Sequence, residues 1–252
     1  MKSPLKSNIH FNCLSELKKI INPKSKISTF FLRDGTIETS LADYGHMIVS
    51  HTNKVPFFEL WSAILQDPIN LAQGVELVHP YMDDEQFIVF QESWHMNQNL
   101  RSRNVLFFIL LMCSDSGYAS IGKMLKDNLN FNTINKLKRF KIDNFFPYFD
   151  ECENTLDALE TAKKTDYILL PVGNHSLNLF EQGKNKGPEM YTFNHKEIYA
   201  RVKDLDKKCI LLYKNHPALF NLYKSFNIRM VDKYGRVADN KESCEDLIIT
   251  NF

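Results

Sequence analysis

Apolar strands alternate with helices at both ends of this chain of 252 residues, and this alternation restricts the possible folds more than any other feature. Near the N-terminus, two β-rich runs, Ser28–Leu32 and His46–Ser50, precede a helix that begins at a proline. Near the C-terminus, Asp166–Pro171 and Cys209–Tyr213 flank a helix that begins after Asn194. Strands that alternate with helices form mostly parallel, doubly wound sheets, so we predict an α/β fold with a Rossmann-like sheet.

The alternation is lost between residues 81 and 159, which read mostly as helices. The longest apolar run in this stretch, Val105–Cys113, has nine residues and is too short to cross a bilayer. We therefore predict an α/β domain made of residues 1–80 and 160–252, interrupted by a mostly helical insert at 81–159. No membrane association is expected.

Net charge and cysteine content argue against several classes of protein. The 31 Lys and Arg residues oppose 30 Asp and Glu residues, so the chain lacks the global positive field of a strong nonspecific nucleic-acid binder. The five cysteines are scattered and never form a Cys-x-x-Cys pair, which indicates reduced thiols and a cytoplasmic protein. Two His/Cys pairs, Cys209 with His216 and His10 with Cys13, lack partners at zinc-site spacing, so we predict no metal.

The last 45 residues have a specific order of elements. The strand Cys209–Tyr213 leads through Lys214-Asn-His-Pro217 into a short helix, the strand Asn227–Val231, a polar hairpin-like segment and the strand Asp246–Phe252. This order resembles the C-terminal half of the DNA adenine methylase (Dam-like) family. Members of that family transfer a methyl group from S-adenosylmethionine (SAM) to the exocyclic amine of adenine. The resemblance implies a methyltransferase fold whose last strand is reversed and inserted between its neighbours.

The resemblance continues into the N-terminal half, where the positions that bind the cofactor differ. In the family, a glycine loop after the first strand lets the backbone approach SAM, because glycine has no side chain. Arg33 and Asp34 stand at two of the three glycine positions, and Gly35 stands at the third. At the end of the next strand, His51 replaces the acid that holds the ribose hydroxyls, while Asn53 matches the family. With these positions altered, we expect no cofactor.

The catalytic positions differ as well. In the family, a strand runs into Asp-Pro-Pro-Tyr, where the aspartate and a proline carbonyl accept hydrogen bonds from the target amine and the tyrosine stacks on the flipped adenine. Here the corresponding positions are Pro171, Val172, Gly173 and Asn174. Pro171 has no side-chain acceptor, and Asn174 offers a poor stacking face. The family's glycine and lysine motif near the N-terminus also has no counterpart between residues 8 and 14.

The densest basic cluster lies within the predicted insert, in the region where the family carries its DNA-recognition segment. Its cations, with two from a later loop, are our candidates for contact with phosphate: Lys136, Lys138, Arg139, Lys141, Lys184 and Lys186.

We therefore predict a DNA adenine methylase-like protein that has lost its catalytic site. Its role would be that of a subunit that associates with DNA, with an active methyltransferase or with another protein, in restriction-modification or phage biology. Two alternatives stay open. One is an active SAM-dependent adenine methyltransferase with divergent motifs, and the other is a fold reused for purely protein–protein contacts.

Overall fold

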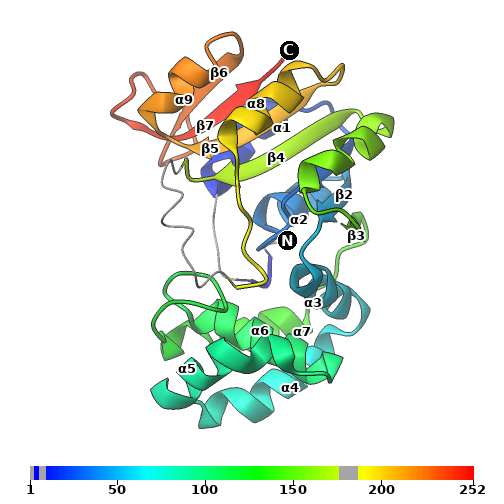
Figure 1. Cartoon of the computed structure of the whole chain (residues 1–252), viewed down its shortest axis with the longest axis vertical. Coiled ribbons are helices and arrows are strands. Elements are labelled where there is room, and N and C mark those ends of the chain that lie inside the picture. The colour runs from blue at the N-terminus through cyan, green and yellow to red at the C-terminus, as the bar shows by residue number, and fades with distance from the viewer. Residues whose placement is uncertain (1–2, 6–9, 176–186) are drawn as a thin grey trace.

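In the computed structural model, residues 3–5, 10–175 and 187–252 are described. Figure 1 shows a sheet in the upper part of the molecule and a group of helices below it. The strands are β1 (Lys26–Phe30), β2 (Met47–Thr52), β3 (Phe145–Phe149), β4 (Tyr167–Gly173), β5 (Cys209–Lys214), β6 (Asn227–Asp232) and β7 (Cys244–Thr250). The helices are α1 (Leu14–Ile20), α2 (Thr36–Asp43), α3 (Val55–Gln66), α4 (Pro68–Val78), α5 (Asp84–Ser93), α6 (Leu100–Cys113), α7 (Phe131–Lys138), α8 (His195–Lys203) and α9 (Pro217–Leu222). Shorter 3-10 segments are η1 (Phe11–Cys13), η2 (His79–Tyr81), η3 (Trp94–Met96), η4 (Lys126–Asn128) and η5 (Thr155–Lys164).

The strand order confirms the predicted fold class. The sheet runs β3-β2-β1-β4-β5-β7-β6, and the pairs from β3 through β5 are parallel. β7 is antiparallel to both of its neighbours, β5 and β6. The fold is therefore a mostly parallel, Rossmann-like sheet, and the reversed last strand lies inside it as the resemblance implies.

Both faces of the central strands are covered, which explains why β4 and β5 are apolar along almost their whole length. Successive residues of β4 point to opposite sides, so that Leu169 joins one core cluster while Ile168 and Leu170 join the other. α1, α2 and α3 contribute to the first cluster, and η5, α8 and α9 contribute to the second.

β3 was missed by the sequence reading, which places this stretch among helices. The strand contains Pro147, and a proline normally argues against a strand because it cannot donate to the ladder. Within the part of the chain that the structure describes, β3 is nevertheless an edge strand that pairs with β2 alone, with Pro147 opposite Ser50. The missing N–H of Pro147 therefore costs no ladder hydrogen bond on the side of β3 that has no neighbouring strand. The division into domain and insert stays a prediction.

The helices below the sheet, α4 to α7, form what we call the helical body (residues 68–138; Figure 1). α6 is its centre, because its residues from Phe107 to Cys113 are all buried. The Arg103 guanidinium connects the helical body to α3 by bidentate hydrogen bonds to the Glu59 carboxylate, of which the shortest, from Nη2 to Oε1, is 2.6 Å. No helix of the described residues combines the length and apolar character needed to cross a membrane.

Candidate functional site

Arg33 spans the carboxyl edge of the sheet, from the end of β1 to the end of β4. Its Nη2 donates hydrogen bonds to the carbonyl oxygens of Pro171 and Val172, at 3.1 and 3.4 Å. Its own carbonyl oxygen accepts a 2.8 Å hydrogen bond from Nε1 of Trp61 in α3. The Arg33 side chain therefore occupies backbone acceptors near the end of β4.

Gly35 stands at a position where packing excludes other residues. Its backbone is left-handed, with φ 63°, and an added Cβ atom would lie 2.3 Å from Cζ2 of Trp61. The preceding Asp34 accepts a 2.8 Å hydrogen bond from the hydroxyl of Thr36, at the start of α2. This loop therefore packs against α3 and is tied to the first residue of α2.

Tyr191 lies between the ends of β1 and β2, in a segment that we call the strap (residues 187–194). Its hydroxyl donates a 3.1 Å hydrogen bond to the Leu32 carbonyl and is also hydrogen-bonded to the Thr52 hydroxyl. Figure 1 shows the strap running from the helical body up to α8. On the helical side, Glu189 accepts hydrogen bonds from the backbone N–H and the hydroxyl of Ser120, at 2.9 and 3.0 Å. Tyr191 thus fills the edge where the resemblance implies a ribose.

His51, at the position of the family's acid, is itself paired with an acid. Nδ1 of His51 and Oδ1 of Asp150 are 3.0 Å apart, and both side chains are buried. The imidazole also stacks on Phe30, with ring centroids 4.6 Å apart. Asp150 directly follows β3, so recognising that strand would have revealed a carboxylate at the ligand-binding edge.

Two buried oxygen atoms at this edge have no hydrogen-bond partner within the described ranges, namely Oδ2 of Asp150 and Oδ1 of Asn53. The Asn53 amide is held in place because Nδ2 donates to the carbonyls of Cys152 and Glu153, at 3.3 and 2.7 Å. A buried acceptor without a partner costs about 1–3 kcal/mol. These atoms therefore suit a ligand that donates hydrogen bonds, and the ribose hydroxyls of SAM have that chemistry. Tyr191 would have to move aside for a ribose to take its place.

Three histidines stack beside the ends of β4 and β5. The ring of His175 stacks on those of His195 and His216, with centroids 4.4 and 4.5 Å apart. Burial, with a smaller contribution from the charge of His216, lowers the pKa of His175. An aromatic surface therefore follows the exposed Asn174 directly. The sequence reading missed it, because the three residues come from separate segments.

Glu38, in the first turn of α2, is a buried carboxyl next to the same edge. Burial raises its pKa to about 7, and the Asp34 carboxylate adds to the shift. The charge of Arg33 and a hydrogen bond with Thr29 oppose it. Tertiary packing alone causes this burial, so no local sequence signal identifies the residue.

A second buried cluster ties the N-terminal segment to β7. Nδ1 of His10 and Oδ1 of Asp246 are 2.9 Å apart, and Lys214 Nζ lies 3.1 Å from the same oxygen. Burial raises the pKa of Asp246, but the hydrogen bond with His10 and the charges of His10 and Lys214 outweigh it and leave the pKa lowered. Cys13 brings a third ligand-type atom within 4.8 Å of the other two. Because Lys214 already neutralises the carboxylate, we interpret this cluster as a structural link.

The predicted phosphate-binding cations have different surroundings. Lys136 Nζ donates to the Ser3 carbonyl, and Lys138 Nζ lies 2.7 Å from Oε1 of Glu76. Arg139 and Lys141 are exposed. Lys184 and Lys186 lie outside the described residues. A role for these cations in phosphate binding stays a prediction.

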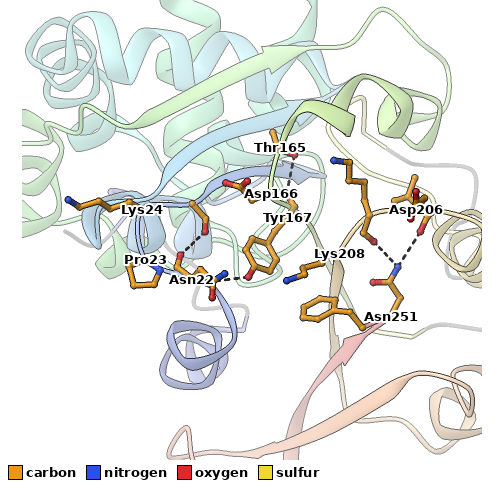
Figure 2. A pocket seen from close by; sticks show the side chains of 13 residues that line it. Asn22, Pro23, Lys24, Thr165, Asp166, Tyr167, Asp206, Lys208 and Asn251 are labelled. Carbon is orange, nitrogen blue, oxygen red and sulfur yellow. Dashed lines mark hydrogen bonds between the residues drawn. The ribbon is translucent and has the colours of Figure 1, made fainter.

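A hollow of about 740 Å³ lies at the opposite edge of the sheet, where β1, β4 and β5 begin (Figure 2). Its polar groups mostly bind one another. Asp166 Oδ2 accepts from the Lys26 N–H at 2.8 Å, and the Asn251 amide donates to the Lys207 carbonyl at 2.8 Å. These contacts fix the ends of strands, so we assign the hollow no function.

Comparison with known proteins gives matches in structure but not in sequence. No protein-family model and no curated protein sequence matches the chain. The fibrillarin/Nop5p complex matches with a TM-score of 0.37 and 9% identity, covering 94% of this chain and 78% of the other. A TehB-like SAM-dependent methyltransferase from Corynebacterium glutamicum gives 0.35 and 8%, with coverages of 95% and 85%. A SAM-dependent methyltransferase from Neisseria gonorrhoeae gives 0.34 and 7%, with coverages of 99% and 67%.

These comparisons correct one prediction. The sequence analysis expects no cofactor, whereas two of these structures are named SAM-dependent methyltransferases, so this expectation is withdrawn. None of the three is named as a DNA adenine methylase. The fold itself follows from the strand order of this chain.

Proposed function

We propose that this chain is a methyltransferase-like protein that does not methylate adenine and that acts by binding a macromolecular partner. The observation that carries this proposal is the end of β4. A target amine needs acceptors that hold it during transfer, but Arg33 occupies the carbonyl oxygens of Pro171 and Val172. Pro171, Val172 and Gly173 supply no polar side chain in their place.

Cofactor binding is a separate matter from transfer. The acceptors that suit a ribose, Asp150 Oδ2 and Asn53 Oδ1, lie at the ends of β2 and β3 and not at the end of β4. A protein of this kind can bind SAM at one position and lack the groups that orient a substrate amine at another.

The helical body supports the partner-binding part of the proposal. Seven of its large apolar side chains are more than half exposed: Ile69, Leu77, Tyr81, Ile88, Val89, Met96 and Phe131. A contiguous apolar patch on a folded protein typically marks an interaction surface, and we infer that these side chains contribute to one.

A transfer assay with tritiated SAM tests the proposal. We expect no label in unmethylated duplex DNA after prolonged incubation with the full chain, while calorimetry measures SAM binding independently. The matched control is Asn174→Ala, which removes the one side-chain amide in the altered motif. Label that wild type transfers to adenine and N174A does not would overturn the proposal.

A further inference from the structure

The surface of the helical body is divided by charge. Residues 76–92 contain five acidic side chains (Glu76, Asp83, Asp84, Glu85 and Glu92) and no Lys or Arg. Residues 121–141 contain six cations (Lys123, Lys126, Lys136, Lys138, Arg139 and Lys141) and one acid, Asp127. The formal charge is therefore −5 on the first stretch and 6 − 1 = +5 on the second.

Both stretches also expose apolar side chains. Leu77, Tyr81, Ile88 and Val89 are 70, 79, 56 and 58% exposed, and we call this first surface, with Asp83, Asp84, Glu85 and Glu92, the acidic face. Ile121, Leu125 and Phe131 are 38, 44 and 72% exposed, and with Lys123, Arg139 and Lys141 they form the basic face. On α4 and η2, Leu77 and Tyr81 lie four residues apart, close to the spacing of one helix face.

The two faces adjoin within one molecule. Lys138 of α7 pairs with Glu76 of α4 at 2.7 Å, and Lys126 donates a 3.0 Å hydrogen bond to the carbonyl of Met82, just before α5. One ion pair and one hydrogen bond to a backbone carbonyl thus hold the segments that carry the two faces against each other.

We propose that the partner of the helical body is a second copy of this chain, related by a two-fold axis. Adjoining faces of opposite charge are self-complementary under such an axis, because each acidic face then meets the basic face of the other copy. The exposed apolar side chains of the two faces would be buried between the copies, with the charges at the rim. This inference rests on the proposed partner-binding function.

Charge reversal in two separate variants tests this arrangement. The acidic-face variant carries Asp84→Lys, Glu85→Lys and Glu92→Lys, which changes the formal charge of residues 76–92 from −5 to +1. The basic-face variant carries Lys123→Glu, Arg139→Glu and Lys141→Glu, which changes that of residues 121–141 from +5 to −1. We expect wild type to be a dimer at about 100 µM protein and about 50 mM salt, with the dissociation constant rising roughly tenfold by about 500 mM salt. Each variant alone places like charges opposite one another and should be monomeric.

Mixing the two variants gives the sharpest result. One chain then presents two positive faces and the other presents two negative faces, so an equimolar mixture should form a one-to-one heterodimer. Analytical ultracentrifugation measures all of these states, and thermal melts check that each variant folds. Lys196→Glu with Lys203→Glu, on the exposed side of α8, is the matched control and should leave the dimer intact.

Wild type that stays monomeric at about 200 µM and low salt, or a dimer that both reversals leave unchanged, would overturn the inference. Adding a short DNA duplex to monomeric wild type then asks whether DNA occupies the basic face instead. The transfer assay remains independent: a monomer without transfer activity contradicts only the dimer, and an active dimer contradicts only the proposed loss of catalysis.

Discussion

Arg33 and Tyr191 determine what can enter the carboxyl edge of the sheet. Arg33 is anchored on β4 by two hydrogen bonds, and Tyr191 is held by β1 and β2. Neither contact is visible in the sequence, because each joins segments more than 130 residues apart. Arg33, which stands at a glycine position of the family that the sequence resembles, thus makes a contact that the sequence does not predict.

Removing the Tyr191 ring should favour cofactor binding. Tyr191→Ala leaves space at the ends of β1 and β2. A ribose in that space could then donate hydrogen bonds to Asp150 Oδ2 and Asn53 Oδ1, which have no partner among the described residues. We expect S-adenosylhomocysteine to bind Tyr191→Ala at least about tenfold more tightly than wild type, which corresponds to about 1.4 kcal/mol. Isothermal titration calorimetry measures this difference. Tyr234→Ala, which truncates an exposed tyrosine between β6 and β7, is the control, and equal affinities for both variants would contradict the expectation.

Glu38 should make stability depend on pH in a defined direction. Its pKa is about 7 in the folded chain, above the ordinary value of 4.5, so the folded state binds more protons between these values. Its contribution is fully present below pH 4.5 and is lost as pH rises through about 7. Glu38→Gln removes this dependence. Its stability relative to wild type should be greater at high pH than at low pH, by up to about 3 kcal/mol.

Urea unfolding at pH 5 and pH 8.5 measures the Glu38 effect. Exposed Glu242→Gln is the control and should follow wild type at both values. If the difference in unfolding free energy between Glu38→Gln and wild type is the same at pH 5 and at pH 8.5, this carboxyl does not titrate as described.

At the level of elements, β7 holds the C-terminal half of the sheet together. Among the strands of the described residues it alone pairs with β6, and it also pairs along β5. Leu247, Ile248 and Ile249 are fully or almost fully buried. Deleting residues 247–252 should therefore leave an insoluble or molten protein, without near-UV circular dichroism and without a cooperative melt. Phe252→Ala is the control, and a deletion variant that melts like wild type would contradict this placement.

Most elements of the sheet could be predicted, whereas most of the site could not. Apolar strands covered on both faces have a clear local signal. The predicted N-cap of α8 is also confirmed, since Asn194 accepts a 3.2 Å hydrogen bond from the Glu197 N–H. β3 was not predicted because it contains Pro147, and the position of Asp150 at the end of this strand was therefore not predicted either. The strap contacts and the histidine stack depend on tertiary neighbours, which one sequence does not reveal.

At the level of the whole molecule, a net charge of +1 means that any affinity for DNA must come from a localised surface. If phosphate contacts form at Arg139 and Lys141, replacing both with glutamine should reduce the slope of log affinity against log salt by about 0.9 for each contact. The melting temperature of this double variant should equal that of wild type, because exposed cations contribute little to stability.

Lys138→Gln serves as the comparison in the same titration, because Lys138 already pairs with Glu76. Fluorescence anisotropy with a labelled duplex between about 20 and 200 mM salt gives the slopes. Wild type that binds no duplex at about 20 mM salt would remove nucleic acid from the possible partners.

The position of β7 also sets an order of events during synthesis. β5 and β6 leave the ribosome before β7, yet they cannot pair with each other, because β7 lies between them in the finished sheet. Until β7 emerges, β6 has no strand to pair with, and one side of β5 is an open edge. Unpaired edges of this kind are prone to wrong association. The nascent chain should therefore depend on chaperones during the interval in which the sheet waits for its last strand.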